Sequence, residues 1–187
     1  MNNKPEVSSS LPLAVKRASS SLKIGGNIGL WVQLVLGVVS IGTLTVPNLV
    51  IDRNATPATP VGIFFAGGGI IALAISIYFS YRYTRIARRL STADSSSRPS
   101  RAVILRQLRI SLIVNLIGLL LTLLGAQAIV GIVLVKSLSQ PPGSVVAQRQ
   151  EFVSSIDLLV IQGNVNIIAA HFAGIVSSLW LTQRLTK

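Results

Sequence analysis

Four long stretches of this chain contain no charged residue, and they constrain the fold more than any other feature of the sequence. They cover residues 24–51, 54–81, 110–135 and 158–183. A helix that crosses the hydrocarbon core of a bilayer needs roughly 20 consecutive apolar residues, and each stretch can supply them. Half of the residues are hydrophobic and only 12% are charged, which is too apolar for an ordinary soluble domain. We therefore expect an all-α, polytopic membrane protein whose four transmembrane helices form two hairpins.

The chain is expected to divide into a short polar segment and one membrane domain. Residues 1–23 are polar, basic and serine-rich, and residues 24–187 form the four-helix membrane domain. The spans are expected at about 27–50, 61–82, 110–135 and 158–182, because Pro57 and Pro60 belong to the turn before the second span. A basic linker, residues 83–109, joins the hairpins. The first apolar run is too long for a signal-peptide core, so we expect the first helix to be retained.

The positive charges predict the orientation of the chain in the membrane. With four spans, every Lys and Arg except Arg53, Lys136 and Arg149 falls on one side. The positive-inside rule then places both termini and the linker in the cytoplasm or its organellar equivalent. Since topology accounts for the net charge of +12, no nucleic-acid partner is expected. Seven arginines around the linker are expected to fix topology or, alternatively, to bind anionic lipid headgroups: Arg82, Arg85, Arg88, Arg89, Arg101, Arg106 and Arg109.

Polar side chains inside the spans are the candidate functional residues. In hydrocarbon each of them needs a partner within the protein, so they either hold helices together or line a polar path. Thr122 and His171 are expected at one depth, and Gln127 and Asn166 at another, which predicts that the third and fourth helices are adjacent. Small residues on one face of every span predict a compact bundle with the fourth helix the most enclosed. The polar candidates are Gln33, Asn115, Thr122, Gln127, Gln162, Asn164, Asn166 and His171.

His171 and Asp157 are weak candidates for metal ligands. Burial favours the neutral imidazole ring, which binds transition metals. The chain has one His and no Cys, and the spans contain no carboxylate in their cores, so a hydrogen-bonded packing role for His171 is favoured over a metal site. The sequence contains no nucleotide-binding loop, no nucleophile paired with a base and no carboxylates at acid–base spacing. We expect neither an enzyme nor a bound cofactor.

Several segments resemble a known family. They are "SYRYTRIARRL" at residues 80–90, "LLLTLLGAQA" at 119–128, "VKSLSQPPG" at 135–143 and "AAHFAGIVSSLW" at 169–180. Together they resemble the family of the twenty-one-kilodalton chloroplast inner-envelope protein, also called permease in chloroplasts, and its cyanobacterial relatives. The resemblance runs from about residue 15 to the C-terminus and implies four spans and a photosynthetic source. It implies a cyanobacterial plasma or thylakoid membrane, or the chloroplast inner envelope if the chain is a mature plastid protein.

The resemblance implies one of two functions. The first is a role in iron or other metal-ion transport or homeostasis. The alternative is a non-transporting component of a membrane protein translocon, or an assembly scaffold. Because four helices enclose little space, we expect a homo-oligomer or other membrane proteins as partners in either case. Membrane lipid is a further expected partner, as is a metal ion in transit if the chain transports one.

Overall fold

The computed structural model describes residues 12–50, 60–91, 98–138 and 155–186. Over these residues the chain forms four helices, α1 (Leu13–Val50), α2 (Pro60–Leu90), α3 (Arg101–Leu138) and α4 (Ser155–Thr186). Each is long and apolar enough to cross a membrane, with a mean hydropathy between 1.6 and 2.4 in its most apolar part. The expected all-α class and the four helices of membrane-spanning length are therefore confirmed. Each expected span lies inside one of the helices.

The ends of the helices follow local sequence chemistry. α2 begins at Pro60, whose fixed φ and missing N–H suit the first position of a helix. Ser100 caps α3, since its Oγ accepts a hydrogen bond of 3.4 Å from the backbone N–H of Val103. α2 ends at Leu90 with Arg88 and Arg89 in its last turn, where positive charge is favourable. The helix thus continues well beyond the charge-free stretch into the basic sequence.

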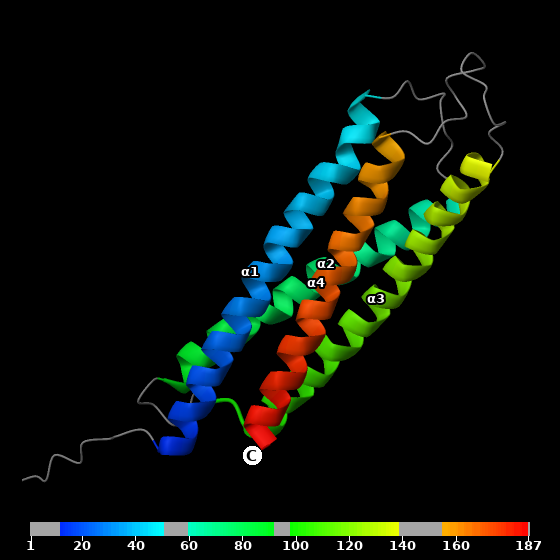
Figure 1. The fold of residues 1–187 in the computed structure, drawn as a ribbon. Helices are drawn as coiled ribbons and strands as arrows, with labels where there is room; N and C mark the ends of the chain where they lie inside the picture. The colour runs from blue at the N-terminus through cyan, green and yellow to red at the C-terminus, as the bar shows by residue number, and fades with distance from the viewer. Residues whose placement is uncertain (1–11, 51–59, 92–97, 139–154, 187) are drawn as a thin grey trace, which may run out of the picture.

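The four helices pack along one another as an antiparallel bundle (Figure 1). α1 contacts α2 and α4, and α3 contacts α2 and α4, while α2 and α4 also touch across one diagonal. α1 and α3 lie on the other diagonal. The start of α1, the end of α2, the start of α3 and the end of α4 lie at the same end of the bundle. The contact between α3 and α4 confirms the adjacency expected from the depth of their polar residues.

The interior contains two apolar clusters separated by polar side chains. Along α2, Ser76 and Ser80 lie between Leu73 of one cluster and Tyr83 of the other. The larger cluster lies where α1 and α3 begin, and it buries Leu22, Tyr83, Ile86, Ala87, Leu90, Ile104, Leu108 and Leu181. The smaller cluster buries Leu73, Ile167 and Ala170. α4 has the largest buried share of the four candidate spans, 33% of its most apolar window, as expected for the most enclosed helix.

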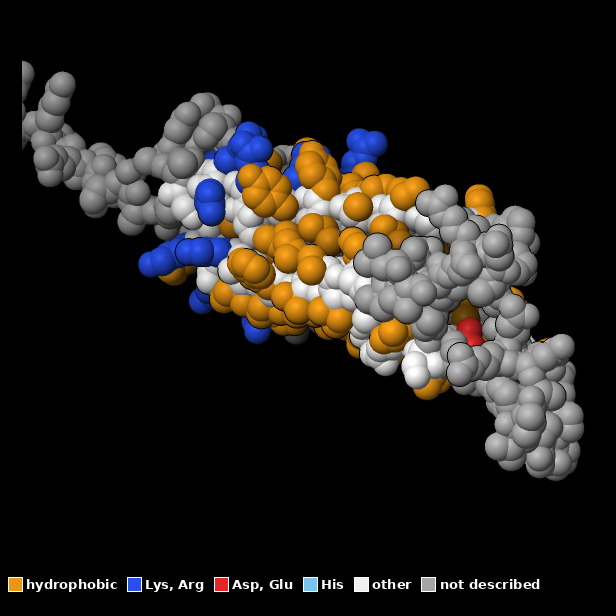
Figure 2. All heavy atoms as spheres, turned by 90° about the horizontal axis from the view of Figure 1, so that it is seen from above, with side chains coloured by type: hydrophobic (Ala, Val, Ile, Leu, Met, Phe, Trp, Pro, Cys, Tyr) orange, Lys and Arg blue, Asp and Glu red, His pale blue; other side chains and the backbone are white. Residues whose placement is uncertain are grey.

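Charged side chains are segregated to the two ends of the bundle. Lys and Arg side chains gather at one end, and a single acidic side chain is visible at the other (Figure 2). That acid is Asp157, in the first turn of α4 and the only Asp or Glu among the described residues. Arg82 is half-buried, whereas the other predicted topology or headgroup residues are exposed: Arg85, Arg88, Arg89, Arg101, Arg106 and Arg109. The charge pattern along the sequence is therefore a real polarity of the folded bundle.

Candidate functional site

A layer of polar side chains fills the centre of the bundle, between the two apolar clusters, and every helix contributes to it. Gln33 of α1, Asn115 of α3 and His171 of α4 are each 0% exposed. Ser76 and Ser80 are the buried hydroxyls that α2 adds. Among the residues that the structure describes, these groups contact one another and backbone oxygens. Their hydrogen bonds define what the layer can do.

Gln33 connects α1 to the three other helices. Its Nε2 lies 2.7 Å from Ser76 Oγ of α2, 3.1 Å from Asn115 Oδ1 of α3 and 3.3 Å from the backbone oxygen of Ala170 in α4. Its Oε1 accepts a hydrogen bond of 3.0 Å from Ser80 Oγ. The amide has two hydrogens for three acceptors, so the contact with Ala170 is the weakest of the three. Through this one side chain the diagonal helices α1 and α3 are joined across the centre.

His171 connects α4 to α2 and α3. Its Nε2 lies 3.2 Å from the backbone oxygen of Gly69, and its Nδ1 lies 3.2 Å from Asn115 Oδ1. Both oxygens can only accept, so a neutral ring, which carries one hydrogen, donates to one of the two. Asn115 Nδ2 in turn donates to the backbone oxygen of Ser111 at 2.9 Å. The imidazole ring is therefore held between two oxygen atoms on two neighbouring helices.

Glycines make the room that these side chains occupy. A Cβ atom at Gly174 would overlap the amide nitrogen of Gln33 and the amide oxygen of Asn115. A Cβ atom at Gly118 would overlap the ring of His171, and one at Gly69 would overlap the hydroxyl of Thr122. Small residues let helix backbones approach closely in membranes. Here they do so at the positions where a neighbouring helix inserts a polar group.

Five of the eight predicted intramembrane polar residues are buried. Gln33, Asn115 and His171 form the central network just described. Thr122 is 0% exposed, packs against Gly69 and donates to the backbone oxygen of Gly118 at 2.7 Å, so it lies beside the same glycines as His171. Asn164 is also 0% exposed, but its Nδ2 donates within α4 to Val160 at 3.1 Å, and its Oδ1 has no hydrogen-bond partner among the described residues.

The other three predicted residues lie at the outside of the bundle. Gln127 of α3 and Gln162 of α4 are exposed, and Asn166 of α4 is half-buried. Gln162 Nε2 donates to Asn166 Oδ1 at 3.1 Å, one turn along the same helix. Asn166 therefore pairs within α4 and not with Gln127 of α3. The predicted polar set divides into an inner group that closes the bundle and an outer group on its surface.

The two candidate metal ligands are far apart. Asp157 and His171 are separated by fourteen residues of α4, which at 1.5 Å per residue is about 21 Å. Both ring nitrogens of His171 already face carbonyl oxygens. Over the described ranges, no three or more His, Cys, Asp or Glu residues come together in a group that could hold a metal ion. The contacts of the polar layer connect the helices to one another.

Ser76 and Ser80 belong to the central network but are not among the site residues predicted from the sequence. They lie seven and eleven residues after Gly69, which at about 100° per residue places all three on one face of α2. The depth of this face, counted from the flanking charges, is the signal that relates the two serines to Gln33. Gly118 and Gly174 carry no such signal, because a glycine that accommodates a side chain is recognised only once its neighbour is known.

Two comparisons with known proteins give a match to this chain. The family described as "Protein of unknown function (DUF3611)" matches residues 12–186. The chain is 33% identical over 177 residues to "Protein TIC 21, chloroplastic" of Arabidopsis thaliana. That match covers 92% of this chain and 59% of the relative, so the chain spans about three-fifths of the relative's length. No solved structure matches the chain.

Proposed function

The chain belongs to the DUF3611 family and is similar to TIC 21, and we propose that it is a multi-pass subunit of a membrane transport assembly. The proposed cargo is iron or another metal ion, as the family resemblance implies. The proposed path lies between associated chains and not through the centre of one bundle. One observation carries this proposal: polar residues close the interior, whereas three further amides lie on the outside within the candidate spans.

The packing of the interior supports a path outside the single bundle. Gln33, Asn115 and His171 are fully buried, and Asn115 Oδ1 lies 3.1 Å from Gln33 Nε2 and 3.2 Å from His171 Nδ1. The space next to them is so closely filled that a single methyl group at Gly118 or Gly174 would overlap a side chain. An ion that crossed here would have to break bonds between all four helices.

The outer amides support association. Gln127 lies in the candidate span of α3, and Gln162 and Asn166 lie in that of α4. The bond between Gln162 and Asn166 uses one N–H and one oxygen, so most of the hydrogen-bonding capacity of these amides faces outward. Polar groups that face lipid cost free energy. A second copy of the chain or another membrane protein would supply partners, and the amide oxygens could face a hydrated cation at such an interface.

A translocon or scaffold role is the second candidate, and the surface beside the amides favours it. Ala169 of α4 is exposed and Ala173 is half-buried, on the same face of the helix as Gln162 and Asn166. Small residues next to amides are typical of surfaces on which another transmembrane helix packs closely. In this role the face binds a partner protein and no ion crosses.

We also propose the orientation that the charges imply. The basic end of the bundle, with the start of α1, the linker between α2 and α3, and the end of α4, would face the cytoplasm or stroma. The proposed location is a cyanobacterial plasma or thylakoid membrane, or the inner envelope of a plastid. A C-terminal reporter should be accessible only from the cytoplasmic side. Labelling of that reporter from the outside in intact cells would contradict the orientation.

Uptake of radioactive iron by liposomes that contain the purified chain separates the two functions. Transport predicts uptake above that of empty liposomes, and a strong loss of uptake in the double variant Gln162→Leu with Asn166→Leu. Val165→Leu is the matched control, because Val165 is an exposed apolar residue of the same helix. Cross-linking in the same liposomes reports association.

Absence of uptake by the wild-type chain, together with stable association that the double variant abolishes, would replace the transport proposal by the scaffold role. Undiminished uptake by a double variant that no longer associates would contradict a path between chains.

A further inference from the structure

One exposed face of α1 carries an ordered series of side chains from the basic end toward the middle of the bundle. At about 100° per residue, a single face presents first a lysine, then an amide, then an indole and then aliphatic groups. These residues are Lys23, Asn27, Trp31, Leu34 and Val38. All five are exposed. The order of polarity is that of a phospholipid lying in one leaflet, with its headgroup at the basic end.

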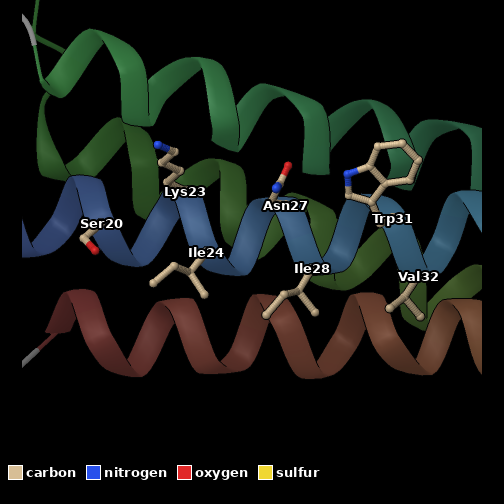
Figure 3. A pocket seen from close by; sticks show the side chains of 7 residues that line it. All are labelled: Ser20, Lys23, Ile24, Asn27, Ile28, Trp31 and Val32. Atoms are coloured by element: carbon tan, nitrogen blue, oxygen red, sulfur yellow. The ribbon is translucent and has the colours of Figure 1, made fainter.

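The face borders a shallow, open groove at the basic end and an apolar hollow farther along α1. Ser20, Lys23, Asn27 and Trp31 border a surface groove of about 670 Å³, together with isoleucine and valine side chains. Lys23, Asn27 and Trp31 point to one side of α1, and Ile24 and Ile28 point to the other (Figure 3). Nearer the middle of the helix an almost entirely apolar hollow of about 120 Å³ lies where α1 meets α2 and α4. Leu34 and Val38 border this second hollow.

The length of the face matches one leaflet. Gly37, which borders the apolar hollow, follows Lys23 by fourteen residues, or about 21 Å of helix. Half of a bilayer, headgroups included, measures about 20–22 Å. If Lys23 lies at the level of the headgroups, the apolar hollow lies near the midplane, where acyl chains end. Trp31 lies between them, with 58% of its surface exposed.

The positive charge at the basic end of the groove favours an anionic ligand. Lys23 and Lys16 lie on the same face of α1 and are exposed. The only described acidic residue, Asp157, is at the opposite end of the bundle, so within the described ranges no carboxylate neutralises Lys23. A zwitterionic headgroup carries its own cation beside the phosphate, whereas an anionic headgroup leaves the phosphate charge for the protein. Juxtamembrane cations attract such lipids.

We propose that this face of α1 is a binding site for an anionic phospholipid of the leaflet at the basic end. Lys23 binds the phosphate, and Asn27, one turn deeper, offers hydrogen bonds to the ester region. One acyl chain runs over Trp31 and Leu34 toward the apolar hollow. The site does not depend on the proposed cargo, and it differs from a general attraction of lipid to the arginines of the linker because it has a defined position on one helix.

Trp31 provides a direct probe of the site. The chain has two tryptophans, and the variant Trp180→Phe leaves only Trp31 to fluoresce. In phosphatidylcholine vesicles that contain a small fraction of phosphatidylglycerol, the acyl chains of one lipid or the other are brominated to quench a nearby indole. We expect phosphatidylglycerol to be enriched next to Trp31 about fivefold over its bulk fraction, which corresponds to the roughly 1 kcal/mol of one juxtamembrane charge. Lys23→Gln should abolish the enrichment.

Two controls make the result specific to the groove. The variant Trp31→Phe leaves Trp180, which packs near Gly25 and stacks on Arg184 at 5.5 Å, as a reporter at the same end of the bundle but outside the groove. Arg109→Gln removes the same charge from α3, on the diagonal away from α1. Equal quenching by the two lipids at Trp31 would overturn the proposal. So would enrichment that Lys23→Gln leaves intact, or enrichment that is equal at Trp180 or equally sensitive to Arg109→Gln.

Discussion

Replacing Gly174 by Ala tests whether the central polar layer holds the bundle together. The added methyl group would overlap the amide nitrogen of Gln33 and the amide oxygen of Asn115. Both amides would have to leave their positions, although the same substitution in an open part of a helix stabilises it by about 0.5–1 kcal/mol. The two effects therefore have opposite signs, and packing decides which one is observed.

The hydrogen bonds that would be lost set the magnitude. Moving the amide nitrogen of Gln33 breaks its three contacts, with Ser76, Asn115 and Ala170. Interhelical hydrogen bonds in membranes are worth about 0.6 kcal/mol each on average, so three bonds contribute about 2 kcal/mol. Overpacking of a filled interior adds about 1–3 kcal/mol. After the gain in helix propensity of about 0.5–1 kcal/mol, we expect Gly174→Ala to lower the free energy of unfolding by about 2–4 kcal/mol.

Unfolding in mixed micelles with increasing dodecyl sulfate, followed by far-ultraviolet circular dichroism, measures this change. Gly131→Ala is the matched control, because Gly131 is an exposed glycine of α3 with no atom within 4 Å of an added Cβ. The control should be unchanged or more stable by up to about 1 kcal/mol. If Gly174→Ala unfolds at the same dodecyl sulfate fraction as Gly131→Ala, the centre of the bundle is not packed as described.

Two further experiments address helix neighbours and the two groups of amides. Cysteines in place of Gly29 and Ser177 should form a disulfide without added catalyst, because the Cβ positions lie 3.3 Å apart, near the separation of about 3.5–4.5 Å in disulfides. Cysteines in place of Gly131 and Ser177 should stay reduced. A non-reducing gel distinguishes the two variants after the chain has been cut by a protease in a loop between the two cysteines. Gln33→Leu should lower the free energy of unfolding by about 1–3 kcal/mol, whereas Gln127→Leu should leave it unchanged. Equal effects of the two variants in the dodecyl sulfate titration would contradict the division into inner and outer amides.

The helices themselves could be predicted because their length and apolarity are dictated by the bilayer and can be counted in the sequence. The contact between α3 and α4 could also be predicted, because Thr122 and His171 can be placed at one depth by counting from the flanking charges. Asn115 and His171 were candidates on the same grounds. In each case the information is local: the residue type and its distance from the end of its own span.

The division of the amides into two groups could not be predicted in this way. Gln162 lies in the small and polar arc of α4 that was expected to face protein, yet it is exposed, because the arc is wider than the surface that α1, α2 and α3 cover. Periodicity shows which residues share a face but not how far a neighbouring helix is rotated or shifted along it. The bond between Gln33 and Asn115 depends on both, since it joins two helices on opposite corners of the bundle whose backbones are not in contact.

The inner and outer amides are chemically alike, but their positions imply different consequences when they are lost. Gln33 has partners on three other helices of its own chain, so its hydrogen bonds contribute to the folding of one copy. Within the described part of the chain, Gln162 is bonded only to Asn166 of its own helix, and in lipid its remaining donors and acceptors call for another molecule. Removing an inner amide should therefore weaken folding at any protein concentration, whereas removing an outer one should weaken association alone. A chain in which Gln162→Leu lowered the stability of the isolated copy would contradict this separation and the proposed role of the outer face.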